Sequence, residues 1–96
     1  MSGGDWKTMF KAIQDNDLEL VSFYLRLGMD PNYQHPEVLA LPLSECIRYN
    51  HLDIAQLLLE NGAKYSIKET ETRMTSLELS QQLKNKNAID LLKRYI

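Results

Sequence analysis

The strongest constraint on this chain of 96 residues is a pattern of side chains that repeats after 34 positions. The repeated positions hold the same residue in two successive copies, pairing Ile13 with Ile47, Asn16 with Asn50, Leu18 with Leu52, Leu25 with Leu59 and Gly28 with Gly62. A third copy is more divergent, as terminal repeats usually are because one of their faces meets water. A unit of this length buries its apolar side by stacking on the next unit, and about three units make a stable core. The sequence therefore predicts a stack of repeated units.

Each copy predicts two helices joined by a tight turn. In the second helix of each copy the apolar residues lie three and four positions apart, which marks one face of a helix. These residues are Leu18, Val21, Tyr24 and Leu25, then Leu52, Ala55, Leu58 and Leu59, then Ala88, Leu91, Leu92 and Tyr95. Shorter first helices are expected at about residues 8–15, 42–49 and 75–83. Asn and Asp residues lie between most of the helices, and Gly28 and Gly62 follow the second helix, where a left-handed residue ends it.

Composition places the chain among ordinary globular proteins. Hydrophobic residues make up 44% and charged residues 25% of the sequence, which is close to the average for water-soluble domains. No apolar run approaches the roughly 20 residues of a membrane span, and the first residues lack the pattern of a signal peptide. The single cysteine, Cys46, cannot form an intrachain disulfide, which fits a reducing compartment. We expect a cytoplasmic protein that does not bind membranes.

Several segments resemble the ankyrin repeat. The resemblance is carried by the helix openings Leu41–Ser44 and Thr75–Glu78, the turn Asn50–Asp53, the leucine runs Leu20–Leu25 and Ile54–Leu59, and the glycine segments Gly28–Asn32 and Gly62–Ser66. It implies an all-α ankyrin-repeat solenoid of about three helix–turn–helix repeats with hairpin loops. The whole chain, residues 1–96, would form one domain, with repeats at about 6–36, 37–70 and 71–96.

The chain departs from the family pattern in three ways. No copy keeps the full T-P-L-H opening, the third copy lacks the glycine segment, and the period is one residue longer than the usual 33. A period of 34 also occurs in tetratricopeptide repeats, but their W-x-x-L-G-x-x-Y opening is absent here. Another helical bundle is the remaining alternative.

No pattern in the sequence indicates catalysis, a cofactor or a metal. The nitrogen and sulfur ligands His35, Cys46 and His51 do not have the spacing of a zinc site. The resemblance implies instead that Cys46 is buried in a first helix and that His51 hydrogen-bonds backbone in a turn. Residues 1–60 carry a net charge of −5 and residues 61–96 a net charge of +3. The basic residues of the second part are interspersed with acidic ones, so we expect no nucleic-acid site.

The resemblance implies a concave surface, built from the hairpins and first helices, that binds a protein partner. The residues expected there are Trp6, Tyr33, His35, Glu37, Arg48, Tyr49, Lys68, Glu71, Arg73 and Met74. Such a module could act as an inhibitor, an adaptor or a regulator. The alternative is a self-associating unit, a homodimer through exposed end faces, although a monomer is expected first.

Two residues of this surface carry sharper expectations. The resemblance places Trp6 before the first helix and facing outward, where tryptophan often dominates binding; the alternative is a cap that shields Phe10 and Phe23. Tyr33 is expected either to pack within its own hairpin or to contact the partner, and the sequence favours neither. Replacing Arg48 and Tyr49 by alanine is expected to weaken partner binding without loss of helical content.

Overall fold

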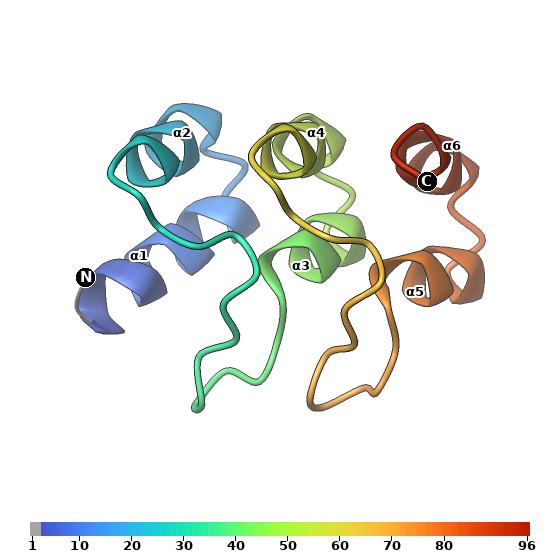
Figure 1. Cartoon of the computed structure of the whole chain (residues 1–96), viewed down its shortest axis with the longest axis horizontal. Coiled ribbons are helices and arrows are strands. Elements are labelled where there is room, and N and C mark those ends of the chain that lie inside the picture. Colours follow the sequence, from blue (N-terminus) through green and yellow to red (C-terminus); the bar gives the residue numbers. More distant parts are fainter. Residues whose placement is uncertain (1–2) are drawn as a thin grey trace.

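The computed structural model describes residues 3–96, with side chains from Trp6 onward, and contains three helix pairs placed side by side (Figure 1). The pairs are α1 (Gly3–Gln14) with α2 (Leu18–Arg26), α3 (Pro42–Arg48) with α4 (Leu52–Glu60), and α5 (Ser76–Gln82) with α6 (Lys86–Lys93). The first helices of the pairs form one layer and the second helices form the other. The stack measures 34 Å along its longest axis. The predicted all-helical repeat stack is confirmed, while the repeat boundaries at residues 36 and 70 stay a prediction.

Helix starts are fixed by capping side chains. Asp17 and Asn85 each accept a backbone N–H from the first turn of the following helix, which satisfies a donor that has no partner within the helix. Thr75 and Glu78 form a reciprocal capping box at the start of α5. The start of α3 has no side-chain cap, and Pro42 lies in its first turn instead. Proline suits this position because it has no N–H that needs a partner and its φ angle is close to that of a helix.

The turns repeat with the same period as the core. Asn16, Asn50 and Lys84 occupy equivalent positions in the three copies and have φ angles of 61°, 59° and 55°. Gly28 and Gly62, after the second helices, have φ angles of 94° and 97°. Asparagine and glycine tolerate this left-handed backbone, whereas a lysine side chain crowds the following carbonyl. The third turn therefore has the same left-handed backbone as the other two, but with a lysine where they have an asparagine.

The first helix is longer than the sequence predicted. It begins at Gly3, five residues before the expected start at about residue 8, while α3 and α5 agree with their predicted ranges to within one residue. Gly3 and Gly4 are poor helix formers, so local propensity gives no signal for this start. Trp6 consequently lies inside α1 and not before it.

The core lies between the two helix layers, and residues one repeat period apart occupy equivalent places in it. Leu58 and Leu92 are both fully buried, and Leu25 and Leu59 both pack in the same cluster. Full burial of one such leucine contributes roughly 1.5–3 kcal/mol. Stacking of equivalent side chains in successive pairs is therefore what stabilises the fold.

Two residues for which the resemblance implied structural roles have those roles. Cys46 is 0% exposed in α3, and its removal from water raises the pKa of the thiol. Nδ1 of His51 lies 2.9 Å from the carbonyl oxygen of Ile13, so the second turn is tied to the preceding helix pair. Both side chains thus belong to the framework of the stack.

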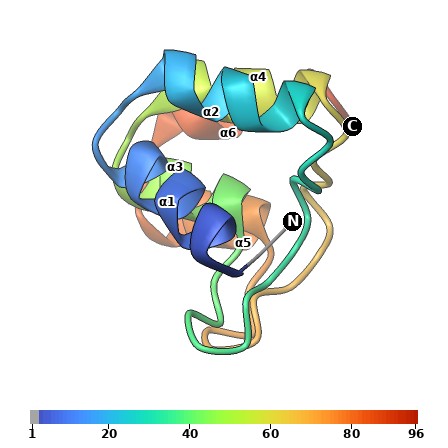
Figure 2. The ribbon, with the colours of Figure 1, turned by 90° about the vertical axis from the view of Figure 1, so that its left-hand side faces the viewer.

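Two long loops connect the pairs. Residues 27–41 lead from α2 to α3, and residues 61–75 lead from α4 to α5. Seen along the stack, both loops follow the same path and reach beyond the first helices (Figure 2). They turn like hairpins, but in the part of the chain that the structure describes their strand pairing is limited to one antiparallel bridge, between Lys68 and Thr75.

Side-chain amides hold the two loops against each other. Asn32 donates to the carbonyl oxygen of Gly62 at 3.0 Å and accepts the backbone N–H of Lys64 at 2.9 Å. Gln34 likewise donates to the carbonyl oxygen of Lys68 at 3.0 Å and accepts the backbone N–H of Thr70 at 2.8 Å. These bonds replace the missing strand pairing, because they satisfy backbone groups of one loop with side chains of the other.

Substitution of Lys84 by asparagine is expected to stabilise the protein by about 0.5–1 kcal/mol, because asparagine accepts the left-handed backbone more readily. Urea unfolding followed by circular dichroism would measure this. Lys64→Asn is the matched control, since Lys64 is exposed and its φ angle is not positive. A Lys84→Asn variant that unfolds at the same urea concentration as the parent would show that the third turn is not strained.

Candidate functional site

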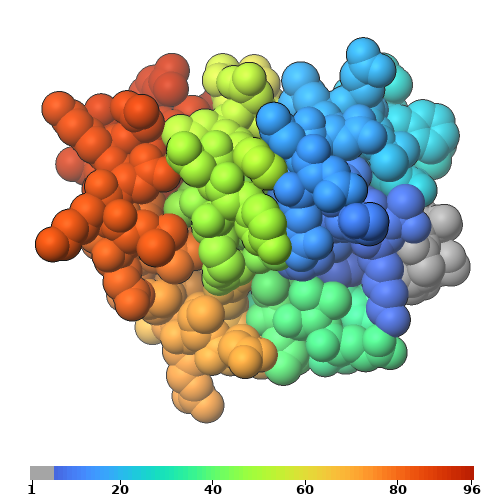
Figure 3. Space-filling model, turned by 180° about the vertical axis from the view of Figure 1, so that it is seen from behind, coloured from blue at the N-terminus to red at the C-terminus, as the bar shows by residue number. Residues whose placement is uncertain are grey.

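The candidate site is a shallow groove between the ends of the first helices and the two loops. The groove has a volume of about 350 Å³, and we call it the concave groove. Its lining residues are Phe10 and Gln14 of α1, Glu45 and Arg48 of α3, Val38, Leu39 and Ala40 of the first loop, and Glu69, Glu71 and Thr72 of the second loop. Figure 3 shows this side of the molecule, with the ends of the helix pairs above and the two loops below.

Arg48 is held between two buried carboxylates at the centre of the groove. Its guanidinium donates to Glu45 in the same helix, and to Glu69 of the second loop at 2.6 Å. The side chains of Glu45 and Glu69 are 7% and 1% exposed, whereas that of Arg48 is 32% exposed. The loop is therefore fastened to α3 by charge-assisted hydrogen bonds that are shielded from water on one side.

Three of the four carboxylate oxygens of Glu45 and Glu69 accept a hydrogen bond from a group other than Arg48. Oε1 of Glu69 also accepts the Thr72 hydroxyl at 2.9 Å, and Oε2 accepts the backbone N–H of Leu41 at 3.1 Å. Oε2 of Glu45 accepts the side-chain amide of Gln14 at 2.7 Å. The network thus joins α1, α3 and both loops, which fixes the shape of the groove.

The electrostatic balance keeps Arg48 charged. Partial burial acts to lower the pKa of Arg48, but the hydrogen bond and the negative charge of Glu69, followed by those of Glu45, outweigh it and leave the pKa raised. Removal of the guanidinium would leave two carboxylates buried without a counter-charge. Arg48 therefore belongs to the framework of the stack as well as to the predicted surface, and the effect of alanine at positions 48 and 49 on helical content and on partner binding stays a prediction.

Trp6 and His35 do not lie on the surface as the sequence analysis expected. Trp6 is 4% exposed; its ring stacks on Phe10 at 5.0 Å and on His35 at 5.5 Å between centroids. His35 is 9% exposed, and its Nδ1 accepts the backbone N–H of Glu37 at 3.1 Å. Burying these large rings stabilises the fold more than leaving them exposed to solvent. The capping alternative for Trp6 is correct for Phe10 and wrong for Phe23, which is 46% exposed.

The other predicted residues form no single patch. Arg48 and Glu71 line the concave groove, and Met74 is half buried against the core. The other five residues are exposed. Tyr33 makes an edge contact with Trp6, Glu37 forms an ion pair with Lys7, and Tyr49 lies beside His51. Lys68 and Arg73 lie on the second loop. Of the ten residues named, the structure thus brings two together in the groove.

Sequence reasoning did not single out Glu45 or Glu69. Glu45 lies in the first turn of a predicted helix, where acidic residues are common, so it carried no distinguishing signal. Glu69 lies in a polar loop, where a carboxylate is ordinarily exposed, but it is 2% exposed. Glu69 lies one repeat period after His35, and the structure shows that both of these loop residues are buried.

Glu69→Ala is expected to lower the free energy of unfolding by about 3 kcal/mol, because it leaves the Leu41 N–H without its acceptor and the Arg48 guanidinium with one partner fewer. Urea unfolding followed by circular dichroism would measure the change. Glu71→Ala, at an exposed position in the same loop, is expected to stay within about 0.5 kcal/mol of the parent. Equal effects of the two substitutions would contradict the role assigned to Glu69.

Within residues 3–96 no three side chains of His, Cys, Asp or Glu come together in a way that could hold a metal ion. No helix in this range is long and apolar enough to cross a membrane.

Comparison with known proteins identifies the repeated unit. The ankyrin repeat family model matches residues 40–69, which contain α3, α4 and the start of the second loop. The chain is also similar to the human 2-5A-dependent ribonuclease, with 36% identity over 55 residues. That region is 57% of this chain and 7% of the ribonuclease, so the chain spans a small fraction of that enzyme.

Ankyrin repeats are generally protein–protein interaction modules, and the family is typically not enzymatic. The matched unit recurs in the structure one period earlier and one period later, with the same helix pair and the same left-handed turn. Residues 40–69 thus form an ankyrin repeat, and the helix pairs before and after it have the same arrangement.

Proposed function

We propose that this chain binds a protein partner in the concave groove. The observation that carries the proposal is the combination, in one groove, of apolar loop residues with a charged cluster whose geometry is already fixed. Val38 and Leu39 supply the apolar part, and both are only partly covered. Because the charged side chains are already ordered, binding a partner there would cost little side-chain conformational entropy.

The charge of the groove favours a basic residue of the partner. Three carboxylates, those of Glu45, Glu69 and Glu71, line the groove against the one guanidinium of Arg48. Since Arg48 already engages the first two, Glu71 is the carboxylate whose hydrogen-bonding capacity remains open to the solvent. We therefore propose a partner that presents a lysine or arginine next to an apolar side chain.

Residues on the rim would contribute to specificity. Tyr49 is 46% exposed at the end of α3, and Lys68 and Arg73 are exposed on the second loop. Exposed tyrosine and arginine side chains often contribute much of the binding energy of an interface. Trp6 and His35 would act indirectly, because they support the first loop from beneath.

The mixed charge of this surface favours a protein over a nucleic acid as partner. Lys68 and Arg73 of the second loop are interspersed with Glu69 and Glu71, whereas a phosphate backbone is bound by a continuous basic stripe. The buried thiol of Cys46 fits a reducing compartment. We accordingly propose a role in the cytoplasm as an inhibitor, adaptor or regulator of another protein.

Glu71→Lys is expected to abolish capture of the partner from a lysate of the native host, because it reverses the charge of the open carboxylate in the groove. The measurement is quantitative affinity capture with the immobilised full chain, followed by mass spectrometry. The fold of each variant would be checked by circular dichroism.

Glu60→Lys is the matched control. Glu60 is also exposed, but it is the last residue of α4, in the layer of second helices. Proteins retained by the parent and by Glu60→Lys but lost with Glu71→Lys would support the proposal. If every captured protein binds the Glu71→Lys variant as well as the parent, the concave groove is not the binding site.

A further inference from the structure

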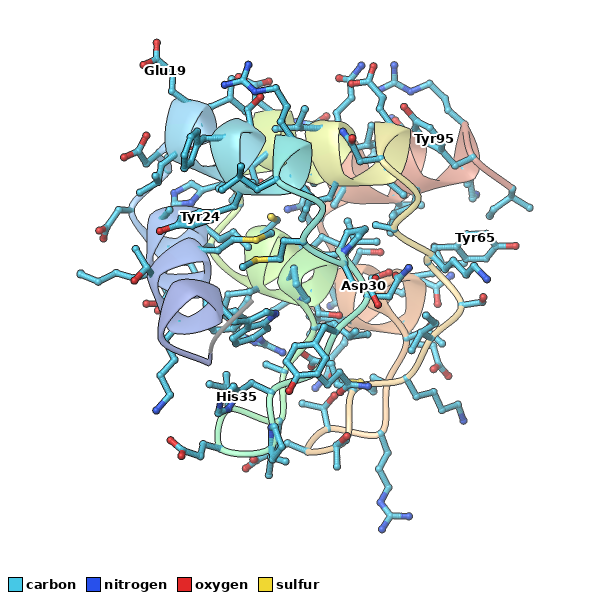
Figure 4. All side chains as sticks on the ribbon, turned by 60° about the vertical axis from the view of Figure 1, so that its left-hand side comes forward. Glu19, Tyr24, Asp30, His35, Tyr65 and Tyr95 are labelled. Carbon is cyan, nitrogen blue, oxygen red and sulfur yellow. The ribbon has the colours of Figure 1, made fainter. Side chains whose placement is uncertain are left out.

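Each of the two long loops turns back at a residue with a left-handed backbone. Leu39 of the first loop has a φ angle of 60°, and Arg73 of the second loop has a φ angle of 59°. These residues lie one repeat period apart, and their N–H groups donate to the carbonyl oxygens of His35 and Glu69, each at 2.9 Å. Figure 4 shows the loops extending below the first helices, with His35 at the turn of the first loop. The same turn thus closes both loops and requires the same backbone conformation.

Leucine and arginine are poorly suited to this conformation. In a left-handed residue the Cβ atom crowds the following carbonyl oxygen, so glycine and asparagine are favoured there and a bulky side chain is strained. The chain has one of these two favoured residue types at four other left-handed positions, which are Asn16, Gly28, Asn50 and Gly62. The two loop turns therefore keep side chains that lower the stability of the fold.

The side chain of Leu39 adds little to the core. Its chain neighbours Val38 and Ala40 pack against the core cluster, whereas Leu39 lies outside this cluster in the part of the chain that the structure describes. Leu39 is partly exposed and lines the concave groove instead. Burial of this side chain therefore compensates little for its strained backbone, and the apolar surface that it adds belongs to the groove.

The guanidinium of Arg73 is available to a partner. Arg73 is exposed, and none of the ion pairs among the described residues includes it. Arg48, by contrast, is held by two carboxylates. The residue before Arg73, Thr72, lines the concave groove. Arg73 therefore places an unpaired positive charge beside the groove, at the turn position that Leu39 occupies in the first loop.

We propose that Leu39 and Arg73 determine which partner the chain binds, with Leu39 in contact with an apolar side chain of the partner and Arg73 paired with a carboxylate. The roles of both residues rest on the proposed function, and they add an acidic residue to the lysine or arginine expected opposite Glu71. Backbone strain of this kind is often found where a protein binds a ligand. The two side chains are kept for binding, and the fold would be more stable without them.

Leu39→Asn and Arg73→Asn are expected to stabilise the fold and to weaken binding at the same time. Asparagine accepts the left-handed backbone, so each variant should raise the midpoint temperature of thermal unfolding, followed by circular dichroism, by about 2–6 °C. Asparagine lacks both the apolar and the cationic group, so the dissociation constant for the partner should rise about tenfold or more. A residue needed only for the fold would not give effects of these opposite signs.

Lys84→Asn is the matched control. Lys84 also has a left-handed backbone, but it lies in the turn between α5 and α6 and does not line the groove. This variant should raise the midpoint temperature in the same way and leave partner binding unchanged.

Arg73→Lys and Arg73→Glu test the charge of the partner. Both variants keep the strained backbone, but only lysine keeps the attraction to a carboxylate. The glutamate variant should therefore bind about tenfold more weakly than the lysine variant.

The probe for binding is a protein that the immobilised parent chain retains from a lysate of the native host, purified and titrated against each variant by isothermal titration calorimetry. A probe that binds the parent and Lys84→Asn but binds weakly to Leu39→Asn and Arg73→Asn, while both of these variants unfold at a higher temperature, supports the proposal. Three results would overturn it: unchanged binding by either asparagine variant, a lower midpoint temperature in either, or equal binding by Arg73→Lys and Arg73→Glu.

Glu71→Lys separates this proposal from the proposed function. If Glu71→Lys loses the probe while Leu39→Asn and Arg73→Asn keep it, the groove is the binding site and the two residues do not select the partner. If the asparagine variants lose the probe while Glu71→Lys keeps it, the two residues act at the loop turns and binding in the groove is wrong. A parent chain that retains no protein from the lysate contradicts both proposals.

Discussion

The structure depends on one constraint, which is that no helix pair of this chain can cover its own apolar side. The second pair shows the solution, since α3 and α4 are buried by the first pair on one side and by the third pair on the other. Stacking works only if equivalent side chains meet at every junction, and this demands a strict interval between copies. The left-handed turns at Asn16, Asn50 and Lys84 keep the same interval, so the whole backbone and not only the core follows it.

The register of the helix pairs also determines the loops. Because both loops leave equivalent helices in the same direction, Asn32 and Gln34 of the first loop reach backbone groups of the second. The buried carboxylate of Glu69 then joins the second loop to Arg48 of α3 and to the Leu41 backbone of the first loop. The groove proposed for the partner is thus a product of the stack.

Much of the framework was predictable from sequence because it rests on local spacing. Helical periodicity, capping residues and glycines located α2 to α6, and the resemblance correctly assigned Cys46 and His51 to the framework. The predictions failed where distant segments compete for a residue. Trp6 was expected outside, but it stacks on His35, which lies 29 positions later. That contact also accounts for the early start of α1 despite two glycines, because tertiary packing outweighs weak helix propensity.

By itself, the sequence determined the repeat interval and hence the stacked helix pairs. The spacing of hydrophobic residues within each helix is a local property, so it can be recognised without the tertiary structure. Only the tertiary structure decided which charges meet in the groove and which loop residues turn inward. Arg48 and Glu69 are well separated in the sequence, and their contact depends on how far the second loop bends back toward α3. A hydrogen bond forms only when donor and acceptor come within a narrow range of distances and angles. Composition and periodicity do not predict whether two residues distant in the sequence meet this condition.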